Sequence, residues 1–286
     1  MKKNIVILLI MLGLFSTVSA QRNEVGLFGG GTYYLGDINP AKHFTFIKPS
    51  YGLVYRYNFT PHWTFKFNAI QGKVYSSDKK IGFNPERNLH FKSKITEVST
   101  QVELNFFKYV TGSKDMLFSP YIFGGFSIFS FNPQAELNGE WYDLQPLGTE
   151  GQGTTAYPEK EPYNLISYAI PFGLGFKLSL SENLSLATEW GLRKTFTDYL
   201  DDVSTTYADP YVLASQNTPV AASLADRTEY QEGEQPVDKT GLQRGDPTTN
   251  DWYSFFGISI TFRLKGRKDV CPAFKGVRSF KEYYTD

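Results

Sequence analysis

Histidine and cysteine, two side chains often used in acid–base and nucleophilic catalysis, are scarce in this sequence of 286 residues. The three histidines, His43, His62 and His90, lie far apart in the chain, and the one cysteine is Cys271. A hydrolytic triad needs a histidine within hydrogen-bond reach of a nucleophile and an acidic residue. No HExxH or paired-cysteine spacing indicates a metal centre. We therefore expect no enzyme activity, no catalytic residue, no metal site and no cofactor, with a serine–histidine site at His43 or His90 as the alternative.

A short acidic run, Thr197–Ser204, is the other candidate for chemistry. Asp198, Asp201 and Asp202 fall within five residues and could offer oxygen ligands to Ca²⁺. The spacing is not that of an EF-hand loop, and aspartates also cap turns by accepting hydrogen bonds from nearby backbone N–H groups. The sequence favours capping and leaves calcium binding as the alternative.

The first twenty residues have the pattern of a cleavable export signal. Lys2 and Lys3 precede an apolar run, Ile5–Phe15, and the small residues of Val18–Ala20 suit signal peptidase. At about 1.5 Å per residue the apolar run is too short for a hydrocarbon core about 30 Å thick. We predict that residues 1–20 are a signal peptide and that the mature chain is exported.

Composition favours a membrane barrel for this exported chain. Aromatic residues make up 16% of the sequence and there are 25 glycines, yet the mean hydropathy is negative. Barrel strands give this combination because only every second residue faces lipid. The formal net charge is zero, so nothing indicates nucleic-acid binding. A soluble β-sandwich is the structural alternative.

Alternation of apolar and polar residues recurs along the mature chain and predicts strands. The clearest segments are Pro49–Phe59 and Val98–Phe106, whereas the register of Tyr121–Phe131 is uncertain because both of its faces are apolar. The eight predicted strands are Glu24–Tyr34, Pro49–Phe59, Trp63–Ala69, Val98–Phe106, Tyr121–Phe131, Tyr168–Ser179, Leu184–Arg193 and Trp252–Leu264.

The connections between these strands alternate between short and long. Thr60–His62, Lys108–Ser119 and Ser181–Asn183 are the short connections; Leu35–Lys48, Tyr75–His90, Asn132–Asn164 and Thr197–Asn250 are the longer ones. Short turns belong on the periplasmic side of a barrel and long loops outside. The sequence thus predicts an all-β, eight-stranded antiparallel transmembrane β-barrel, residues 21–264, in the outer membrane of a Gram-negative cell. Both termini are then periplasmic, and the polar stretch Tyr207–Pro247 is expected to be poorly ordered.

Strand parity assigns seven charged side chains to the barrel interior: Arg56, Lys66, Glu103, Lys177, Glu189, Arg193 and Arg263. Side chains roughly fill the lumen of an eight-stranded barrel. Because buried charges must be paired or solvated, we expect a network of ion pairs across the lumen. An ion or solute path through the same polar interior is the functional alternative.

Three segments carry a resemblance to a known family. The run Gly29–Asn39 opens the barrel, Ser119–Tyr121 starts the fifth strand, and Asp198–Ser204 follows the seventh. Together they resemble the PorG-type outer-membrane proteins of the type IX secretion system. The resemblance implies a structural component in outer-membrane lipid that anchors or positions a periplasmic ring of the PorK lipoprotein and PorN. The alternative is a small outer-membrane channel or surface-binding barrel without a role in secretion.

A C-terminal tail, residues 265–286, is the predicted contact surface for such a ring, because periplasmic partners can touch only the short turns and the termini. Its candidate partner-binding residues are Cys271, Phe274, Phe280, Tyr283 and Tyr284, of which the aromatic ones belong to types enriched in interface cores. An unpaired thiol in an oxidising compartment favours an intermolecular disulfide at Cys271. A thiol that stays free or is capped by a small thiol is the alternative.

Overall fold

The structure is a computed structural model that describes residues 23–113, 115–230 and 235–264. The predicted signal peptide, residues 1–20, and the predicted tail, residues 265–286 with Cys271, Phe274, Phe280, Tyr283 and Tyr284, lie outside the described residues. Within the described part of the chain, no helix has the length and apolar character needed to cross a membrane.

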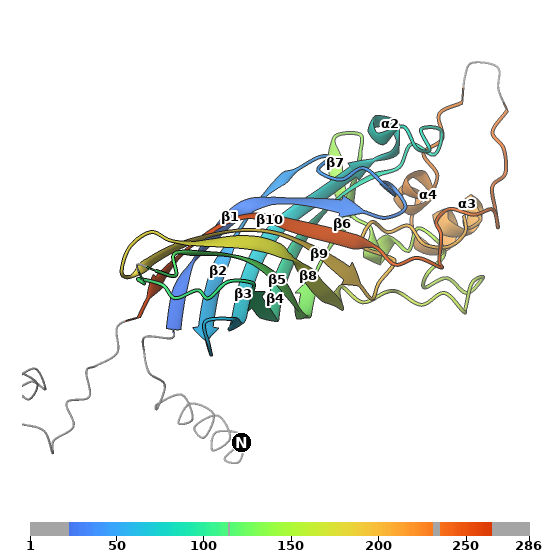
Figure 1. Cartoon of the computed structure of the whole chain (residues 1–286). Coiled ribbons are helices and arrows are strands. Elements are labelled where there is room, and N and C mark those ends of the chain that lie inside the picture. The colour runs from blue at the N-terminus through green and yellow to red at the C-terminus, as the bar shows by residue number, and fades with distance from the viewer. Residues whose placement is uncertain (1–22, 114, 231–234, 265–286) are drawn as a thin grey trace, which may run out of the picture.

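Eight antiparallel strands close into a barrel in the part of the chain that the structure describes (Figure 1). They are β1 (Asn23–Leu35), β2 (Lys48–Asn58), β3 (Trp63–Ser77), β4 (His90–Asn105), β5 (Phe118–Ser130), β8 (Ile166–Ser179), β9 (Leu184–Thr195) and β10 (Trp252–Arg263). Each strand pairs with its neighbour in the chain order, and β1 pairs with β10 to complete the circle. The predicted fold class, an eight-stranded antiparallel β-barrel, is confirmed.

The barrel is apolar outside and polar inside, as the alternation predicts. On β4, Val98 and Val102 are exposed on the outer wall, whereas Ser99, Gln101 and Glu103 are buried in the lumen. The structure also decides the register of β5, which has apolar residues on both faces. Its lumen side carries large buried rings, and its outer side carries exposed apolar residues: Tyr121, Phe123 and Phe129 face inward, and Ile122, Phe126 and Ile128 face outward.

Two strands extend further than the sequence predicts. β3 continues from Ala69 to Ser77, and β4 already begins at His90. The polar outward residues in these extensions hide the alternation of apolar side chains, but the backbone pairing runs on until Ser77 faces His90. The β3–β4 hairpin therefore rises beyond the apolar part of the wall.

The connections sort to opposite ends of the barrel. The turn end, as we name it, holds the short connections 59–62, 106–117 and 180–183 together with Asn23 and Leu264. The loop end holds the long connections 36–47, 78–89, 131–165 and 196–251 (Figure 1). These loops carry α2 (Asp78–Ile81), β6 (Pro133–Leu137), β7 (Glu140–Asp143), η2 (Gln145–Leu147), α3 (Pro210–Val212), η3 (Leu213–Asn217) and α4 (Pro219–Ala225), with β6 paired to the start of β4.

The prediction that Tyr207–Pro247 is poorly ordered is wrong for the described residues of this stretch. Three short helical segments fold there, and Thr218 caps α4 by accepting a hydrogen bond from the Ala221 amide. Leu213 and Leu224 are buried, and Leu224 packs in one cluster with Ala135 of β6. The polar composition of the stretch concealed these few apolar anchors, which acquire a core only when the other loops cover them.

Candidate functional site

A buried carboxylate in the lumen, near the turn end, lies close to three cations from three other strands. Glu103 on β4 lies 3.3 Å from Arg56 Nε on β2 and 3.3 Å from Lys66 Nζ on β3. Lys177 Nζ on β8 approaches its other oxygen at 2.5 Å. All four side chains are almost fully excluded from solvent. Because the barrel is closed, strands far apart in the sequence meet at this one carboxylate.

Two further carboxylates extend the network along the lumen. Glu189 on β9 lies 2.7 Å from Lys66 Nζ and 4.0 Å from Arg56. Arg193 pairs instead with Glu97, with 3.1 Å between Arg193 Nε and Glu97 Oε2. The structure therefore brings six of the seven predicted interior residues into ion pairs.

Arg263 does not join this network. As the last residue of β10, it lies half-buried at the turn end, and it donates a hydrogen bond from Nη1 to the Thr111 carbonyl. Among the described residues it makes no ion pair. Its inward direction agrees with strand parity, but its guanidinium binds the Thr111 carbonyl, although Glu24 lies opposite Arg263 in the β1–β10 register.

Sequence reasoning missed two carboxylates of the lumen. Glu97 lies one residue before the predicted start of its strand, so a strand longer by one residue would have included it. Glu24 alternates with the exposed Val25 and Leu27 and accepts hydrogen bonds from Thr111 Oγ1 at 2.6 Å and Asn58 Nδ2 at 2.8 Å. Among the described strand residues named above, four lumen carboxylates therefore face four cations: Glu24, Glu97, Glu103 and Glu189, with Arg56, Lys66, Lys177 and Arg193.

Side chains close the lumen above and below the charges. At the turn end, connection 106–117 tucks Tyr109 and Thr111 into the barrel, where both are buried. Towards the loop end, the rings of Phe129, Tyr253 and Phe255 pack against one another. An ion or solute path would require these rings and ion pairs to move aside.

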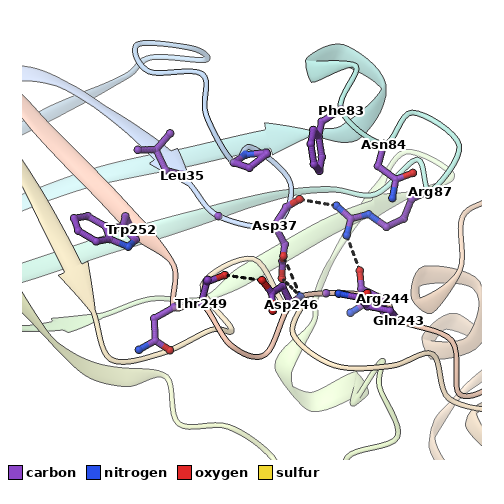
Figure 2. Close-up of a pocket in the computed structure, with 14 residues that line it drawn as sticks. Leu35, Asp37, Phe83, Asn84, Arg87, Gln243, Arg244, Asp246, Thr249 and Trp252 are labelled. Atoms are coloured by element: carbon purple, nitrogen blue, oxygen red, sulfur yellow. Dashed lines mark hydrogen bonds between the residues drawn. The ribbon is translucent and has the colours of Figure 1, made fainter.

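The loop end contains a pocket of about 700 Å³ between three of the long connections (Figure 2). Arg87 donates two hydrogen bonds of 2.8 Å to the Asp78 carboxylate. The same guanidinium donates to the Asp37 carbonyl at 2.9 Å and to the Arg244 carbonyl at 2.6 Å. One arginine therefore fixes connections 36–47, 78–89 and 196–251 to one another.

The Asp37 carboxylate lies against the backbone on the opposite wall of this pocket. Both of its oxygens accept from the Asp246 amide at 3.1 Å. A Cβ on Gly245 would come within 2.5 Å of the same carboxylate, so the close approach depends on a glycine there. Burial raises the pKa of Asp37 to about 6, because a charged carboxylate loses solvation in the pocket wall.

Beneath the pocket, buried acids outnumber the cations. Arg244 pairs with Glu150 at 3.0 Å. Tyr34 OH is within hydrogen-bond distance of both Asp201 and Asp251, yet a phenol has one proton to donate. Burial together with neighbouring negative charges raises the pKa of both carboxyl groups well above the usual range, which favours a protonated carboxyl group beside the phenol.

In the acidic run Asp201 caps a turn, whereas Asp202 contacts side chains of another loop. Asp201 Oδ1 accepts from the Val203 amide at 2.9 Å, and Asp202 accepts from Tyr163 OH at 2.7 Å. Burial raises the pKa of Asp202 to about 6 and that of Asp198 to about 8. Within the described ranges, no group of three or more histidine, cysteine, aspartate or glutamate side chains is arranged to hold a metal ion.

Each histidine ring lies within hydrogen-bond distance of a tyrosine hydroxyl or a backbone group. His43 Nδ1 lies 3.0 Å from Tyr33 OH, and His62 Nδ1 lies 3.0 Å from the Asn105 carbonyl. His90 Nε2 accepts from the Glu136 amide at 3.1 Å. The structure brings none of these three rings into a hydrogen bond with a serine hydroxyl among the described residues.

A closed barrel with an apolar outer wall and a charged, filled lumen defines a transmembrane β-barrel of the outer-membrane class. The chain belongs to the DUF6089 family, a domain of unknown function, whose profile matches residues 2–218. The sequence matches no curated protein.

Several solved structures resemble this barrel at low sequence identity. Neisserial surface protein A is 8% identical, with 85% of this chain and 97% of that chain covered and a TM-score of 0.43. Ail of Yersinia pestis, in complex with a heparin analogue, is 7% identical over 85% and 97% of the two chains, with a TM-score of 0.39. OprG of Pseudomonas aeruginosa is 11% identical over 85% and 98%, with a TM-score of 0.38. At these values the likenesses imply nothing about what this chain binds.

Proposed function

We propose that this barrel is a non-enzymatic component of a type IX secretion machine that anchors or positions a periplasmic ring of PorK and PorN. The assignment to this machine is supported by the family resemblance of three segments, Gly29–Asn39, Ser119–Tyr121 and Asp198–Ser204. The observation that carries an anchoring role is the closed lumen, in which Glu103 collects three cations. A barrel without an open path acts through its surfaces.

The turn end is the surface assigned to the ring in this proposal, on the rule that short turns are periplasmic. Connection 106–117 is the largest described part of that end, and it exposes Phe106, Phe107 and Val110. Leu264 lies at the same end, and the tail, residues 265–286, follows it in the sequence. Its residues Cys271, Phe274, Phe280, Tyr283 and Tyr284 are proposed as the ring contact, with an intermolecular disulfide at Cys271.

Deleting residues 267–286 tests this proposal in native envelopes. The truncated barrel is expected to insert and to show heat-dependent migration on gels, yet to lose copurification with PorK and PorN. A matched control at the loop end is Tyr211→Ala, which removes an 85% exposed ring and should leave copurification intact. Persistence of the full complex in the truncated barrel would refute the tail contact.

The disulfide is tested separately by Cys271→Ser. On non-reducing gels the wild-type protein is expected to migrate as a larger species that reducing agent and the substitution both abolish. Identical migration of the wild-type protein under both conditions contradicts an intermolecular bond.

A second candidate function, a surface-binding barrel, is favoured by the pocket at the loop end. Its wall combines Phe83, which is 66% exposed, with the ion-paired Arg87 and the carboxylate of Asp37. A ligand held there would protect the loops around Asn84 from hydrogen exchange in whole envelopes. If the purified barrel conducts ions in planar bilayers instead, both the anchor and this surface role lose their main support.

A further inference from the structure

A cluster of lysines lies on the outer wall of the barrel at the loop end of β3 and β4. Lys73 and Lys94 are directly opposite each other in the strand register, and Lys92 faces Tyr75 two residues further along. Lys73 and Lys94 are exposed and alternate with buried residues such as Val74 and Ile95, so they point away from the lumen. We call Lys73, Lys92 and Lys94 the lysine edge.

Two more lysines flank the lysine edge, and aromatic rings hold several of the ammonium groups. Lys92 Nζ lies 3.4 Å from the ring centroid of Trp141 on β7. Lys48 and Lys80 place their Nζ atoms 5.2 and 5.5 Å from the centroid of Tyr75. Cation–π contacts of this kind orient the ammonium groups without neutralising their charge.

Glu136 on β6 lies close enough to Lys92 to act on its charge, but it does not pair with the lysine edge in the described structure. None of its lysines forms an ion pair there. The nearby Asp143 instead accepts hydrogen bonds from Asn132 at 2.9 Å and from Gln134 at 2.6 Å. Like charges directly opposite each other destabilise a strand pair, so an external anion would relieve a repulsion built into the barrel wall.

The lysine edge lies at the level where lipid headgroups are expected, at the upper limit of the apolar band of the barrel. Trp63 lies at the turn end of β3, and Lys73 follows ten residues later on the same face. Ten residues at about 3.3 Å each, in a strand tilted by about 40°, rise about 25 Å, which is the height of the apolar band of such barrels. Below the lysine edge, Val98 and Ile128 are paired in the register and exposed on the same wall.

A pocket of about 460 Å³ opens between these lysines. It is lined by Lys73, Lys92 and Lys94 and also by the polar side chains of Ser93, Thr96, Asn132 and Gln134. Ammonium, hydroxyl and amide groups are donors suited to the oxygens of a phosphate group. The apolar wall below offers a surface for acyl chains.

We propose that the lysine edge binds the phosphate-bearing headgroup of a membrane lipid in the leaflet at the loop end, with its acyl chains along the wall at Val98 and Ile128. The lipid phosphate pairs with ammonium groups that form no ion pair in the described structure. This site is independent of the secretion role proposed above, because it lies at the opposite end of the barrel from the short turns.

Native mass spectrometry of the barrel extracted from mixed vesicles tests the proposal. The vesicles contain equal amounts of phosphatidylglycerol and phosphatidylcholine. Three lysines acting together should favour retained phosphatidylglycerol by at least about tenfold. K73Q/K92Q/K94Q is expected to remove this preference, and K94Q alone should reduce it. The matched control K79Q/K108Q/K194Q changes the net charge equally at exposed lysines elsewhere and should keep the preference.

Equal retention of both lipids by the wild-type barrel, or an unchanged preference in K73Q/K92Q/K94Q, would overturn the proposal. A second arm separates lipid from a free anion by following the fluorescence of Trp141, with Trp141→Phe as the reference. Phosphatidylglycerol in the vesicle should change this emission, and inorganic phosphate added to pure phosphatidylcholine vesicles should not. An equal response to inorganic phosphate would assign the pocket to free anions and defeat the lipid assignment.

Discussion

The lumen and the loop end both bury charged side chains, but in different ratios. In the lumen four carboxylates face four cations, and Glu103 alone contacts three of the cations. At the loop end the acids are more numerous than the arginines that hold them: Asp37, Asp78, Glu150, Asp198, Asp201, Asp202 and Asp251 surround Arg87 and Arg244.

This difference shows that the two regions accommodate buried charged side chains in different ways. In the lumen each charge is compensated by opposite charges, so removing one partner leaves an uncompensated buried charge. At the loop end we expect protons to offset part of the excess of acids, because burial raises the pKa values of Asp201 and Asp251 well above the usual range. We therefore expect a barrel that responds strongly to substitution and a loop end that responds to pH.

Glu103→Gln should have the largest effect. It leaves Arg56, Lys66 and Lys177 around a neutral amide, and breaking a buried ion pair in this way costs about 3–5 kcal/mol of unfolding free energy. Urea unfolding in lipid vesicles measures this cost. Glu229→Gln is the control because its pair with Lys79 is exposed, so no change is expected. A loss of unfolding free energy below about 1 kcal/mol would mean that water screens the charges in the lumen. The lumen would then not differ from the loop end as described above.

Arg244→Met should weaken the loop end without affecting the barrel. It removes the 3.0 Å pair with Glu150 and the hydrogen bond to the Ala225 carbonyl, at a local cost of about 2–3 kcal/mol. Hydrogen exchange is expected to speed up at residues 196–205, while the unfolding midpoint of the barrel stays constant. Lys239→Met, which breaks a more exposed pair with Asp226, serves as the control. A concerted loss of barrel stability would show that the two regions are one cooperative unit.

The loop end should loosen as the pH rises. The pKa values of Asp37 and Asp202 are about 6 and that of Asp198 is about 8, against an ordinary value of 3.8. The folded loops therefore bind more protons than the unfolded loops, so their stability is complete below pH 3.8 and is lost as the pH rises through about 6 and 8. Proteolysis of residues 196–205 between pH 5 and pH 9 measures this. Cleavage that is independent of pH would contradict the protonated state.

Asp201→Asn should have the smallest effect. An amide resembles a protonated carboxyl group, so a change within about 0.5 kcal/mol is expected near neutral pH. At pH 9 the variant should resist proteolysis better than the wild type, because it cannot ionise. Tyr34→Phe is the contrasting variant, since it removes the hydroxyl between Asp201 and Asp251 and should be more damaging. A greater loss in Asp201→Asn than in Tyr34→Phe would show that Asp201 is charged.

The sequence by itself determined the barrel, its strand order and the direction of most interior charges. The side-chain period of a strand is two, so alternation tells which residues face inward without any knowledge of the partner strand. Arg56, Lys66, Glu103, Lys177, Glu189 and Arg193 were found in this way. Glu97 was missed because its strand is longer than its apolar alternation, and the helices after Tyr207 were missed because they have no core of their own.

Only the tertiary structure decided which charges meet. Lys66 and Glu189 are 123 positions apart and Arg193 and Glu97 are 96 apart, so barrel closure and strand register bring them together. The same register sets Lys73 against Lys94 on the outer wall. The excess of acids at the loop end arises because four loops from different parts of the chain pack onto one rim. Local sequence patterns specify the direction of a side chain, whereas its partner depends on contacts between distant segments.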